Sequence, residues 1–234
     1  MRIWRRARRL LILATAGFLL LSTFFVVLYE IIPPLVTPLM LIRLAQGEGL
    51  HKDWVSYDQV SPNLFRAVIA AEDSRFCQHH GIEVGAIMDA WRKNQNGGNV
   101  HGASTITMQT AKNLYLWPGR SYLRKAIEVY FTLLMEGLWS KRRILELYVN
   151  VVEWGHGIYG AEAAAQHHFK KSAKELTRRE AALLAAVLPN PRRWAAGKPS
   201  SYIKRRAQTI LERMRVLPES DSLLCPVGHI EEKS

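Results

Sequence analysis

The chain has 234 residues, of which 48% are hydrophobic and 22% are charged. This length suits one well-packed domain with an appendage, and this composition excludes a disordered chain. Lys and Arg number 32 against 20 Asp and Glu, and the resulting net charge of +12 favours a polyanionic partner or an anionic membrane. Two cysteines, Cys77 and Cys225, exclude a disulfide scaffold and a thiolate zinc site but allow one disulfide.

The first 30 residues have the pattern of a membrane anchor. Five arginines lie within residues 1–9, and Leu10–Tyr29 follow without a charged residue. As a helix this run is about 30 Å long, which matches the hydrocarbon core of a bilayer, and the arginines are expected in the cytoplasm. The length and apolarity of the run disfavour a buried core helix. A cleaved signal peptide has a shorter apolar region that ends in small residues, so we predict an uncleaved signal anchor.

The rest of the chain is expected to form one extracytoplasmic domain. From Arg43 onward the net charge is +8, because residues 1–42 hold five arginines and Glu30 as their only acid. Pro33, Pro34 and Pro38 interrupt the apolar stretch after the anchor, which predicts a linker or an interfacial segment. The predicted organisation is a cytoplasmic basic tail over 1–9, a transmembrane signal anchor over 10–30, a linker over 31–49, a globular domain over 50–217 and a C-terminal tail over 218–234.

The globular domain shows helical periodicity nearly throughout. Helix starts are indicated by Ser61 before Pro62, by Ser121, by Ser140, and by a capping box of Thr177 with Glu180. No run alternates with period two, so the fold class is predicted to be mainly α. The expected helices cover 61–76, 85–93, 104–116, 121–138, 140–149, a short segment ending at 169, 181–188 and 201–217, with a polar loop over 94–102 and a turn over 155–160.

Glu72 is the first candidate catalytic residue. It follows Val68 by four residues and Leu64 by eight, which puts its carboxyl on the helix face that otherwise enters the core. A desolvated carboxylate of this kind suits a general base or acid. Periodicity leaves the alternative open that Glu72 turns into solvent at the helix end and pairs with Arg75 or Arg66.

Glu128 is the second candidate. It follows Arg124 by four residues and Lys125 by three, which is the spacing of an exposed intrahelical ion pair. The same residues suit the edge of a cleft for an anionic substrate, because four cations precede Glu128 with no acid among them. These cations are Lys112, Arg120, Arg124 and Lys125. Spacing alone leaves both interpretations open.

Two pairs of adjacent histidines need a separate interpretation. His79 and His80, like His167 and His168, are neighbours in the chain and lack the i, i+4 spacing of a helical zinc site. We interpret them as structural or polar contacts.

Five motifs resemble those of the bacterial peptidoglycan glycosyltransferases, in the same order. Residues 72–81, Glu-Asp-Ser-Arg-Phe-Cys-Gln-His-His-Gly, resemble E-D-x-x-F-x-x-H-x-G, and residues 102–109 resemble G-x-S-T-I-x-Q-Q. Residues 124–128 match R-K-x-x-E, residues 144–150 resemble I-L-E-x-Y-L-N, and residues 157–169 have the G-x-x-x-A-A-x-x-F character. The resemblance covers residues 50–217. One departure is Met108, which stands before Gln109 where the family usually has a first glutamine.

The resemblance implies a lysozyme-like, mainly α glycosyltransferase domain over 50–217. Such a domain polymerises lipid II into β-1,4 glycan strands, with inversion at C1 and release of undecaprenyl pyrophosphate. Glu72 would be the general base and Glu128 a second catalytic glutamate, while Lys112, Arg120, Arg124 and Lys125 would contact the donor pyrophosphate. The remaining motif residues expected near the substrate are Asp73, Phe76, His79, Gly81, Gly102, Ser104, Thr105 and Gln109.

The resemblance also implies a divalent metal, Mg²⁺ or Mn²⁺, with Glu128 as a candidate ligand, and no organic cofactor. The expected partners are lipid II, the growing glycan strand, membrane lipids and other cell-wall synthesis or division proteins, and no nucleic acid. The chain resembles the monofunctional members of a family that also includes the glycosyltransferase domain of class A penicillin-binding proteins. The expected location is the bacterial cytoplasmic membrane, crossed once, with the catalytic domain outside.

Two other functions are weighed against this one. A lysozyme-like hydrolase could use Glu72 as an acid to cleave glycan strands, but its neutral leaving group needs no cluster of cations. A non-catalytic membrane-anchored scaffold that binds lipid II would not need both glutamates and the cations.

Overall fold

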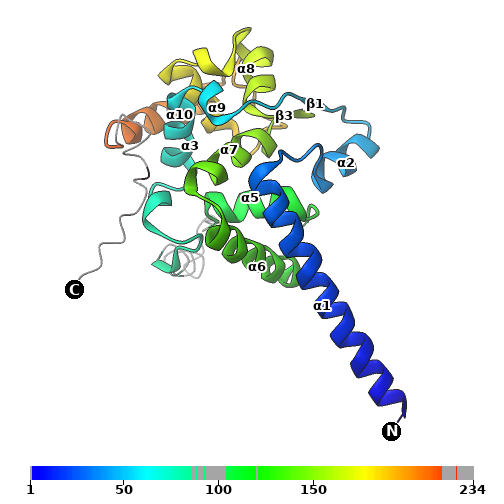
Figure 1. Ribbon diagram of the computed structural model, residues 1–234. Helices are drawn as coiled ribbons and strands as arrows, with labels where there is room; N and C mark the ends of the chain where they lie inside the picture. The colour runs from blue at the N-terminus through cyan, green and yellow to red at the C-terminus, as the bar shows by residue number, and fades with distance from the viewer. Residues whose placement is uncertain are drawn as a thin grey trace, which may run out of the picture.

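The computed structural model describes residues 2–85, 88, 92, 104–119, 121–217 and 225. One long N-terminal helix extends from a domain of shorter helices (Figure 1), so the mainly α prediction is confirmed. The helices are α1 Arg2–Ile31, α2 Pro38–Ala45, α3 Pro62–Glu72, α5 Ile106–Tyr115, α6 Tyr122–Leu138, α7 Lys141–Val151, α8 Ala161–Phe169, α9 Arg178–Val187 and α10 Ser201–Met214. Short 3₁₀ turns cover Tyr57–Gln59, Phe76–Gln78 and Ala173–Glu175. The helix predicted over 85–93 and the loop over 94–102 lie largely outside the described residues.

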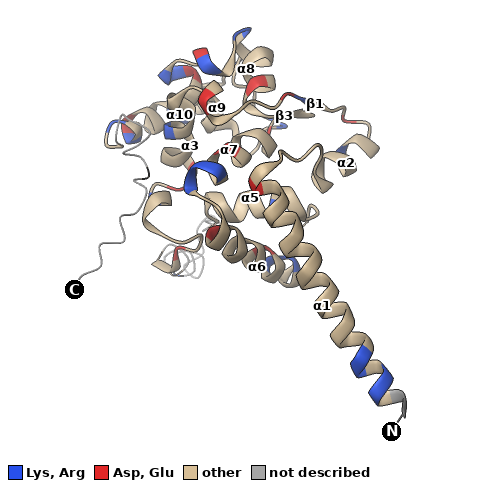
Figure 2. Ribbon diagram, viewed as in Figure 1, with Lys and Arg blue, Asp and Glu red and all other residues tan. Residues whose placement is uncertain are grey.

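Helix α1 is long and apolar enough, by length and composition, to cross a membrane, over Trp4–Ile31. Figure 2 shows its basic residues confined to the N-terminal turns. The other end of α1 is fixed to the domain. The indole Nε1 of Trp139 donates a hydrogen bond of 2.9 Å to the carbonyl of Val26, and the guanidinium of Arg143 donates two, of 2.8 and 3.1 Å, to that of Tyr29. The helix is therefore docked on the domain and is not a free tether.

The segment predicted as a linker contains helix α2. Thr37 is its N-cap, and Pro38 is its first helical residue. Proline has no N–H to lose at this position, and its fixed φ suits the start of a helix. Pro38 therefore begins a short helix within the segment that was predicted as a linker or an interfacial segment.

The predicted helix starts are confirmed by side-chain caps. Ser61, Ser121, Ser140 and Thr177 each accept a hydrogen bond from a backbone N–H in the first turn that follows. The predicted end of the first of these helices is wrong. Helix α3 ends at Glu72, four residues before Phe76, because Asp73 takes an extended conformation with φ −161° and ψ 74°.

A small sheet, not predicted from the sequence, lies beside α8. Its strands are β1 His51–Lys52, β2 Glu153–Gly155 and β3 Ile158–Tyr159, in the order β1-β3-β2. Strand β3 pairs parallel to β1 and antiparallel to β2, and an irregularity separates Glu153 from Gly155 in the second pairing. Strands of two or three residues are too short to show an alternation of polar and apolar side chains, so the sequence pattern did not predict them.

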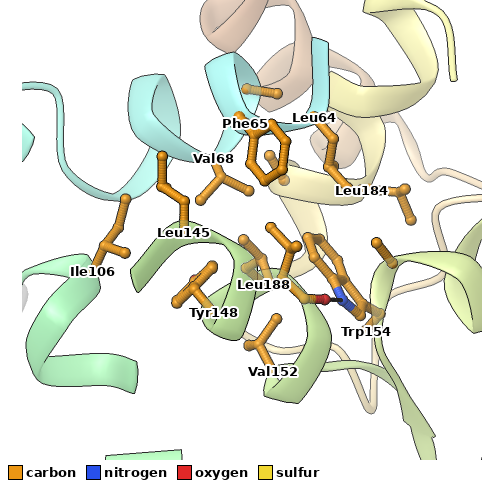
Figure 3. Packing of buried hydrophobic residues seen from close by; sticks show 14 of the residues in the cluster. Leu64, Phe65, Val68, Ile106, Leu145, Tyr148, Val152, Trp154, Leu184 and Leu188 are labelled. Carbon is orange, nitrogen blue, oxygen red and sulfur yellow. Dashed lines mark hydrogen bonds between the residues drawn. The ribbon is translucent and has the colours of Figure 1, made fainter. Parts of the chain in front are cut away.

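The core lies between α3, α7 and α9. Figure 3 shows apolar side chains from these helices meeting around Trp154, whose Nε1 donates a hydrogen bond of 3.0 Å to the carbonyl of Val149. The labelled residues are at most 9% exposed: Leu64, Phe65, Val68, Ile106, Leu145, Tyr148, Val152, Trp154, Leu184 and Leu188. Because this core fixes α3, which packs on α9 and α10, it also fixes Glu72 at the end of α3.

Two contacts attach the C-terminal part of the chain. Buried Arg66 of α3 donates hydrogen bonds to the carbonyls of Met214, at 2.7 Å, and Leu217, at 3.0 Å, where a positive charge favourably meets the C-terminal end of α10. A disulfide joins Cys77 to Cys225 with a Cα–Cα distance of 5.0 Å. Cys77 packs against the core and carries this bond, the one disulfide that the two cysteines allow.

Gly81 should be intolerant of a side chain. Its φ is +79°, and an added Cβ would lie 2.6 Å from Cγ2 of Thr132 and 2.7 Å from Cγ of Glu136. We expect Gly81→Ala to destabilise the protein by about 2 kcal/mol or more, which lowers the midpoint of thermal unfolding by about 5 °C. In the matched control Gly137→Ala the added Cβ meets nothing within 4 Å, so stability should be unchanged or slightly higher. Equal midpoints for the two variants would contradict the tight packing at Gly81.

Candidate active site

Glu72 is held in a partly buried position at the end of α3. Its side chain is 14% exposed, Gln109 Nε2 donates a hydrogen bond of 2.9 Å to Oε2, and a guanidinium nitrogen of Arg206 lies 3.9 Å from Oε1. The alternative of a solvent-facing glutamate paired with Arg75 or Arg66 is wrong. Arg75 pairs with Glu83 at 2.8 Å, and Arg66 binds the end of α10.

The amide of Gln109 is oriented from behind by Tyr148 of α7. The hydroxyl of Tyr148 donates a hydrogen bond of 3.2 Å to Oε1 of Gln109. Burial, assisted by the negative charges of Glu72 and Asp73, raises the pKa of Tyr148 well above its usual value, so this hydroxyl stays protonated and remains a donor. With Oε1 occupied, the amide nitrogen of Gln109 faces Glu72. In the sequence, Tyr148 appeared only as the tyrosine of the motif at residues 144–150 and was not a candidate site residue.

Asp73 joins the end of α3 to the start of α5. Its Oδ2 accepts a hydrogen bond of 3.0 Å from the backbone N–H of Ile106, and its Oδ1 lies 2.9 Å from Nε2 of His79. The backbone N–H of Gly81 donates to Nδ1 of the same ring at 3.1 Å. Because Nδ1 accepts a hydrogen bond, the ring proton is assigned to Nε2, which donates a hydrogen bond to the carboxylate of Asp73. This confirms the interpretation of His79 as a structural contact.

Other motif residues hold the loop after Glu72 in place. The hydroxyl of Thr105 donates a 2.6 Å hydrogen bond to the carbonyl of Gly81 and caps α5 by accepting the N–H of Met108 at 3.2 Å. Phe76 is fully buried, and Nζ of Lys141 lies 4.4 Å from the centre of its ring. These contacts, like those of Asp73, are within the protein. They tie the segment that follows Glu72 to the start of α5 and to the core of the domain.

Met108 points into the protein interior. Its exposure is 2%, whereas the next residue, Gln109, faces Glu72. Neighbouring residues on a helix point in different directions, so the amide usually found at position 108 would not share the place of Gln109 beside Glu72. The departure from the family motif thus leaves the contact with Glu72 intact.

The second glutamate is buried between two cations. The side chain of Glu128 is 3% exposed, and its two oxygens lie 2.7 Å from a guanidinium nitrogen of Arg124 and 2.5 Å from Nζ of Lys125. Lys125 also donates a hydrogen bond of 3.1 Å to Oγ of Ser104. The predicted intrahelical pairing is confirmed, but the interpretation as an exposed surface pair is wrong. A buried carboxylate with two charged partners fixes both of them in position.

Lys112 adds a third cation to this cluster. Burial is the main cause that lowers the pKa of Lys112, and the positive charges of Arg124 and Lys125 lower it further. The negative charges of Glu128 and Glu72 raise it. These interactions place Lys112 within electrostatic reach of both candidate glutamates. No carboxylate among the described residues lies within ion-pair distance of its Nζ. An anion bound there would offset the excess positive charge of the cluster. Arg120 and Gly102 lie outside the described residues.

A cavity of about 450 Å³ opens beside this cluster. Its charged lining consists of four basic side chains and one acid: Arg43, Lys112, Arg124, Arg192 and Glu153. Burial raises the pKa of Glu153. The hydrogen bond from the Gly157 N–H and the charges of Arg43 and Arg192 act in the opposite direction and lower it. Sequence reasoning missed Arg43 and Arg192 because they lie 149 residues apart and belong to no common motif. Gln109 lines the same cavity, so the cavity reaches the residue that contacts Glu72.

The described residues do not fit a resident divalent metal. Asp73, His79 and Glu83 bring their ligand-type atoms within 4.8 Å of one another. Both ring nitrogens of His79 are engaged, however, and Glu83 pairs with Arg75. The oxygens of Glu128 are likewise taken by Arg124 and Lys125. A Mg²⁺ or Mn²⁺ ion held by protein carboxylates would have to displace these partners.

Residues 40–215 match the family model described as Transglycosylase, which extends from α2 to α10 and includes Glu72, Glu128 and the cavity. The chain belongs to the transglycosylase family. A relative from Rhodospirillum centenum, named biosynthetic peptidoglycan transglycosylase, is 54% identical over 211 residues, which cover 90% of this chain and 91% of the relative. A relative of the same name from Caulobacter vibrioides is 51% identical over 79% of this chain and 81% of the relative. Another, from Bdellovibrio bacteriovorus, is 47% identical over 90% of this chain and 87% of the relative. The expected lysozyme-like, mainly α transglycosylase domain is confirmed by this membership.

Tyr148→Phe tests the orientation of Gln109. It removes the hydrogen bond to Oε1 while keeping the buried ring, so the amide loses its fixed orientation toward Glu72. We expect the kcat of transglycosylation to fall about five-fold with little change in KM, as for the loss of one hydrogen bond. The control Tyr159→Phe removes a buried hydroxyl that has no hydrogen-bond partner among the described residues, so it should leave the rate unchanged. A raised KM with an unchanged kcat in Tyr148→Phe would contradict the positioning role.

Proposed function

We propose that this transglycosylase is a peptidoglycan glycosyltransferase that polymerises lipid II into β-1,4 glycan strands, with Glu72 as the general base. The names of the relatives support peptidoglycan as the product. One contact carries the assignment of the base. Gln109 binds Glu72 and also lines the cavity that holds Lys112 and Arg124, so a carboxylate and a group of cations adjoin one space.

In the proposed reaction, Glu72 takes the proton from the 4-hydroxyl of the acceptor GlcNAc. The oxygen of that hydroxyl attacks C1 of the donor MurNAc at the same time. The bond between C1 and the pyrophosphate oxygen breaks, and the pyrophosphate leaves with the electron pair. Attack opposite the leaving group inverts C1 and produces the β linkage. Positioned general bases contribute about 10² to 10⁴ in rate.

The basic side of the cavity is proposed to bind the leaving pyrophosphate. Lys112 and Arg124 line the cavity, and Lys125 forms an ion pair with Glu128, which also binds Arg124. Fixed guanidinium and ammonium groups stabilise the charge that grows on the leaving group, without reorganising during the reaction. Arg120 is included in this proposal by its motif position alone. Glu128 would act by holding Arg124 and Lys125, and Ser104 by fixing Lys125.

Mg²⁺ or Mn²⁺ is given no step in this mechanism. The described carboxylates that could bind it are already paired, so a divalent cation would depend on substrate phosphates for its ligands.

The proposed location is the cytoplasmic membrane, with the catalytic domain on its outer face. Helix α1 suits a single crossing, and its basic N-terminal residues favour the cytoplasmic side. The Cys77–Cys225 disulfide supports the same orientation, because disulfides persist on the oxidising side of the membrane. Both substrates carry lipid tails, so an anchor holds the enzyme on the surface where they diffuse. Other cell-wall proteins are proposed partners on functional grounds alone.

Glu72→Gln should abolish polymerisation. The variant keeps a hydrogen-bonding side chain beside Gln109 but cannot accept the proton, so we expect the rate to fall by at least about 100-fold with lipid II binding retained. Detergent-solubilised protein, labelled lipid II and gel separation of the glycan strands measure this. Glu212→Gln, a change at an exposed position of α10, is the matched control. Shortening of preformed strands by the wild type would indicate a hydrolase, and bound lipid II without polymer from the wild type would indicate a scaffold.

The orientation predicts the state of the two cysteines in intact cells. If the domain is exported, a thiol-alkylating reagent should label neither Cys77 nor Cys225 until a reductant is added. Cys77→Ser should release one thiol for labelling, and Cys225→Ser should do the same. Labelling of both thiols in the wild-type protein without a reductant would contradict an outward-facing domain. Mass spectrometry of the alkylated protein provides the measurement.

A further inference from the structure

A second basic pocket lies along α10 and has no role in the mechanism above. It has a volume of about 270 Å³ and is built mainly by α10, with one residue from α3. Its lining residues are Ala71, Tyr202, Arg205, Arg206, Thr209, Ile210 and Arg213. None of them lines the larger cavity beside Lys112. Because Ala71 directly precedes Glu72 in the chain, this pocket also adjoins the proposed base.

The pocket carries more positive charge than its neighbours neutralise. Three arginines line it, and the carboxylate that the described residues bring closest is Glu72, at 3.9 Å from Arg206. The Nε of Arg206 is buried and has no hydrogen-bond partner in the part of the chain that the structure describes. Arg213 donates one long hydrogen bond, of 3.4 Å, to the carbonyl of Ala70, and Arg205 is exposed. Guanidinium groups arranged in this way suit carboxylate or phosphate anions.

The position of the pocket distinguishes these two anions. Helix α1 and helix α10 lie at opposite ends of the molecule in Figure 1, with α3, α5 and α6 between them. Helix α1 packs on α6, whereas α10 packs on α3 and α9. In the proposed reaction the lipid-linked pyrophosphate is bound by Lys112 and Arg124, which line the larger cavity and not this pocket. The soluble part of the substrate can reach α10: it is a glycan whose MurNAc units carry peptides with free carboxylates.

We propose that the α10 pocket binds carboxylates of the peptide carried by the glycan strand, close to the point of attack at Glu72. This inference rests on the proposed peptidoglycan substrate. The peptide would pair with Arg205 and Arg213, while Arg206 lies between the pocket and Glu72. Such a contact would recognise peptide-bearing glycan as it passes the base and would leave the pyrophosphate to the cations near α6.

The test compares two lipid II substrates in detergent solution. One carries the native peptide, and in the other the peptide carboxylates are converted to amides. We expect kcat/KM of the full-length wild type to be about ten-fold lower on the amidated substrate, as for the loss of one hydrogen bond to a charged group. The double variant Arg205→Gln, Arg213→Gln should lose the same factor on the native substrate and nothing further on the amidated one.

Arg215→Gln is the matched control, because it removes an arginine just after α10 that does not line the pocket. It should behave as the wild type on both substrates, and thermal unfolding of every variant checks the fold. Equal wild-type rates on the two substrates would overturn the inference. An equal loss by the double variant on both would also overturn it, since that pattern indicates a pyrophosphate contact or a structural role. Absence of polymer from either substrate with the wild type would contradict the proposed function itself, and the inference would fall with it.

Discussion

Asp73 accepts hydrogen bonds from the backbone N–H of Ile106 and from the ring of His79, and its side chain is only 2% exposed. The first N–H groups of a helix have no partner within it, and leaving one of them buried and unpaired costs about 1–3 kcal/mol. The carboxylate therefore joins the start of α5 to the end of α3. Glu72 lies one residue before this junction, and Gln109 lies three residues beyond Ile106. The proposed base and the amide that orients it are thus placed by the same buried carboxylate.

The charges around this junction are arranged for an anion that the protein does not itself provide. Glu128 neutralises part of the cluster by pairing with Arg124 and Lys125, but Lys112 remains without a carboxylate at ion-pair distance among the described residues. Burial lowers its pKa, so the charged form is held at a cost that a bound phosphate would relieve. Removing Glu128 would leave neighbouring cations to repel one another. Under the proposed function, Glu128 would act by balancing these charges and would take no direct part in proton transfer.

The arrangement of helices also separates the two ends of the substrate. Helix α1 docks on α6 through Trp139, and the larger cavity lies between α2, α5 and the start of α6. Helix α10, with its own basic pocket, packs on the other side of α3. Under the proposed function, lipid-linked phosphates meet the protein near α1 and the glycan passes toward α10. Glu72 lies between the two, at the point where a new bond would form.

The sequence by itself determined the apolar anchor, the helix starts capped by Ser61 and Thr177, and the motifs that carry Glu72 and Glu128. These features depend on neighbouring residues, whose spacing is fixed by helix geometry. The sequence could not give the early end of α3, because that end depends on hydrogen bonds that Asp73 accepts from Ile106 and His79, beyond the helix. Only the tertiary structure decided three further features: the burial of Glu128, the hydrogen bond from Tyr148 to Gln109, and the presence of Arg43 and Arg192 in the lining of one cavity. Each of them requires side chains distant in sequence to share one space, and local periodicity carries no record of such contacts.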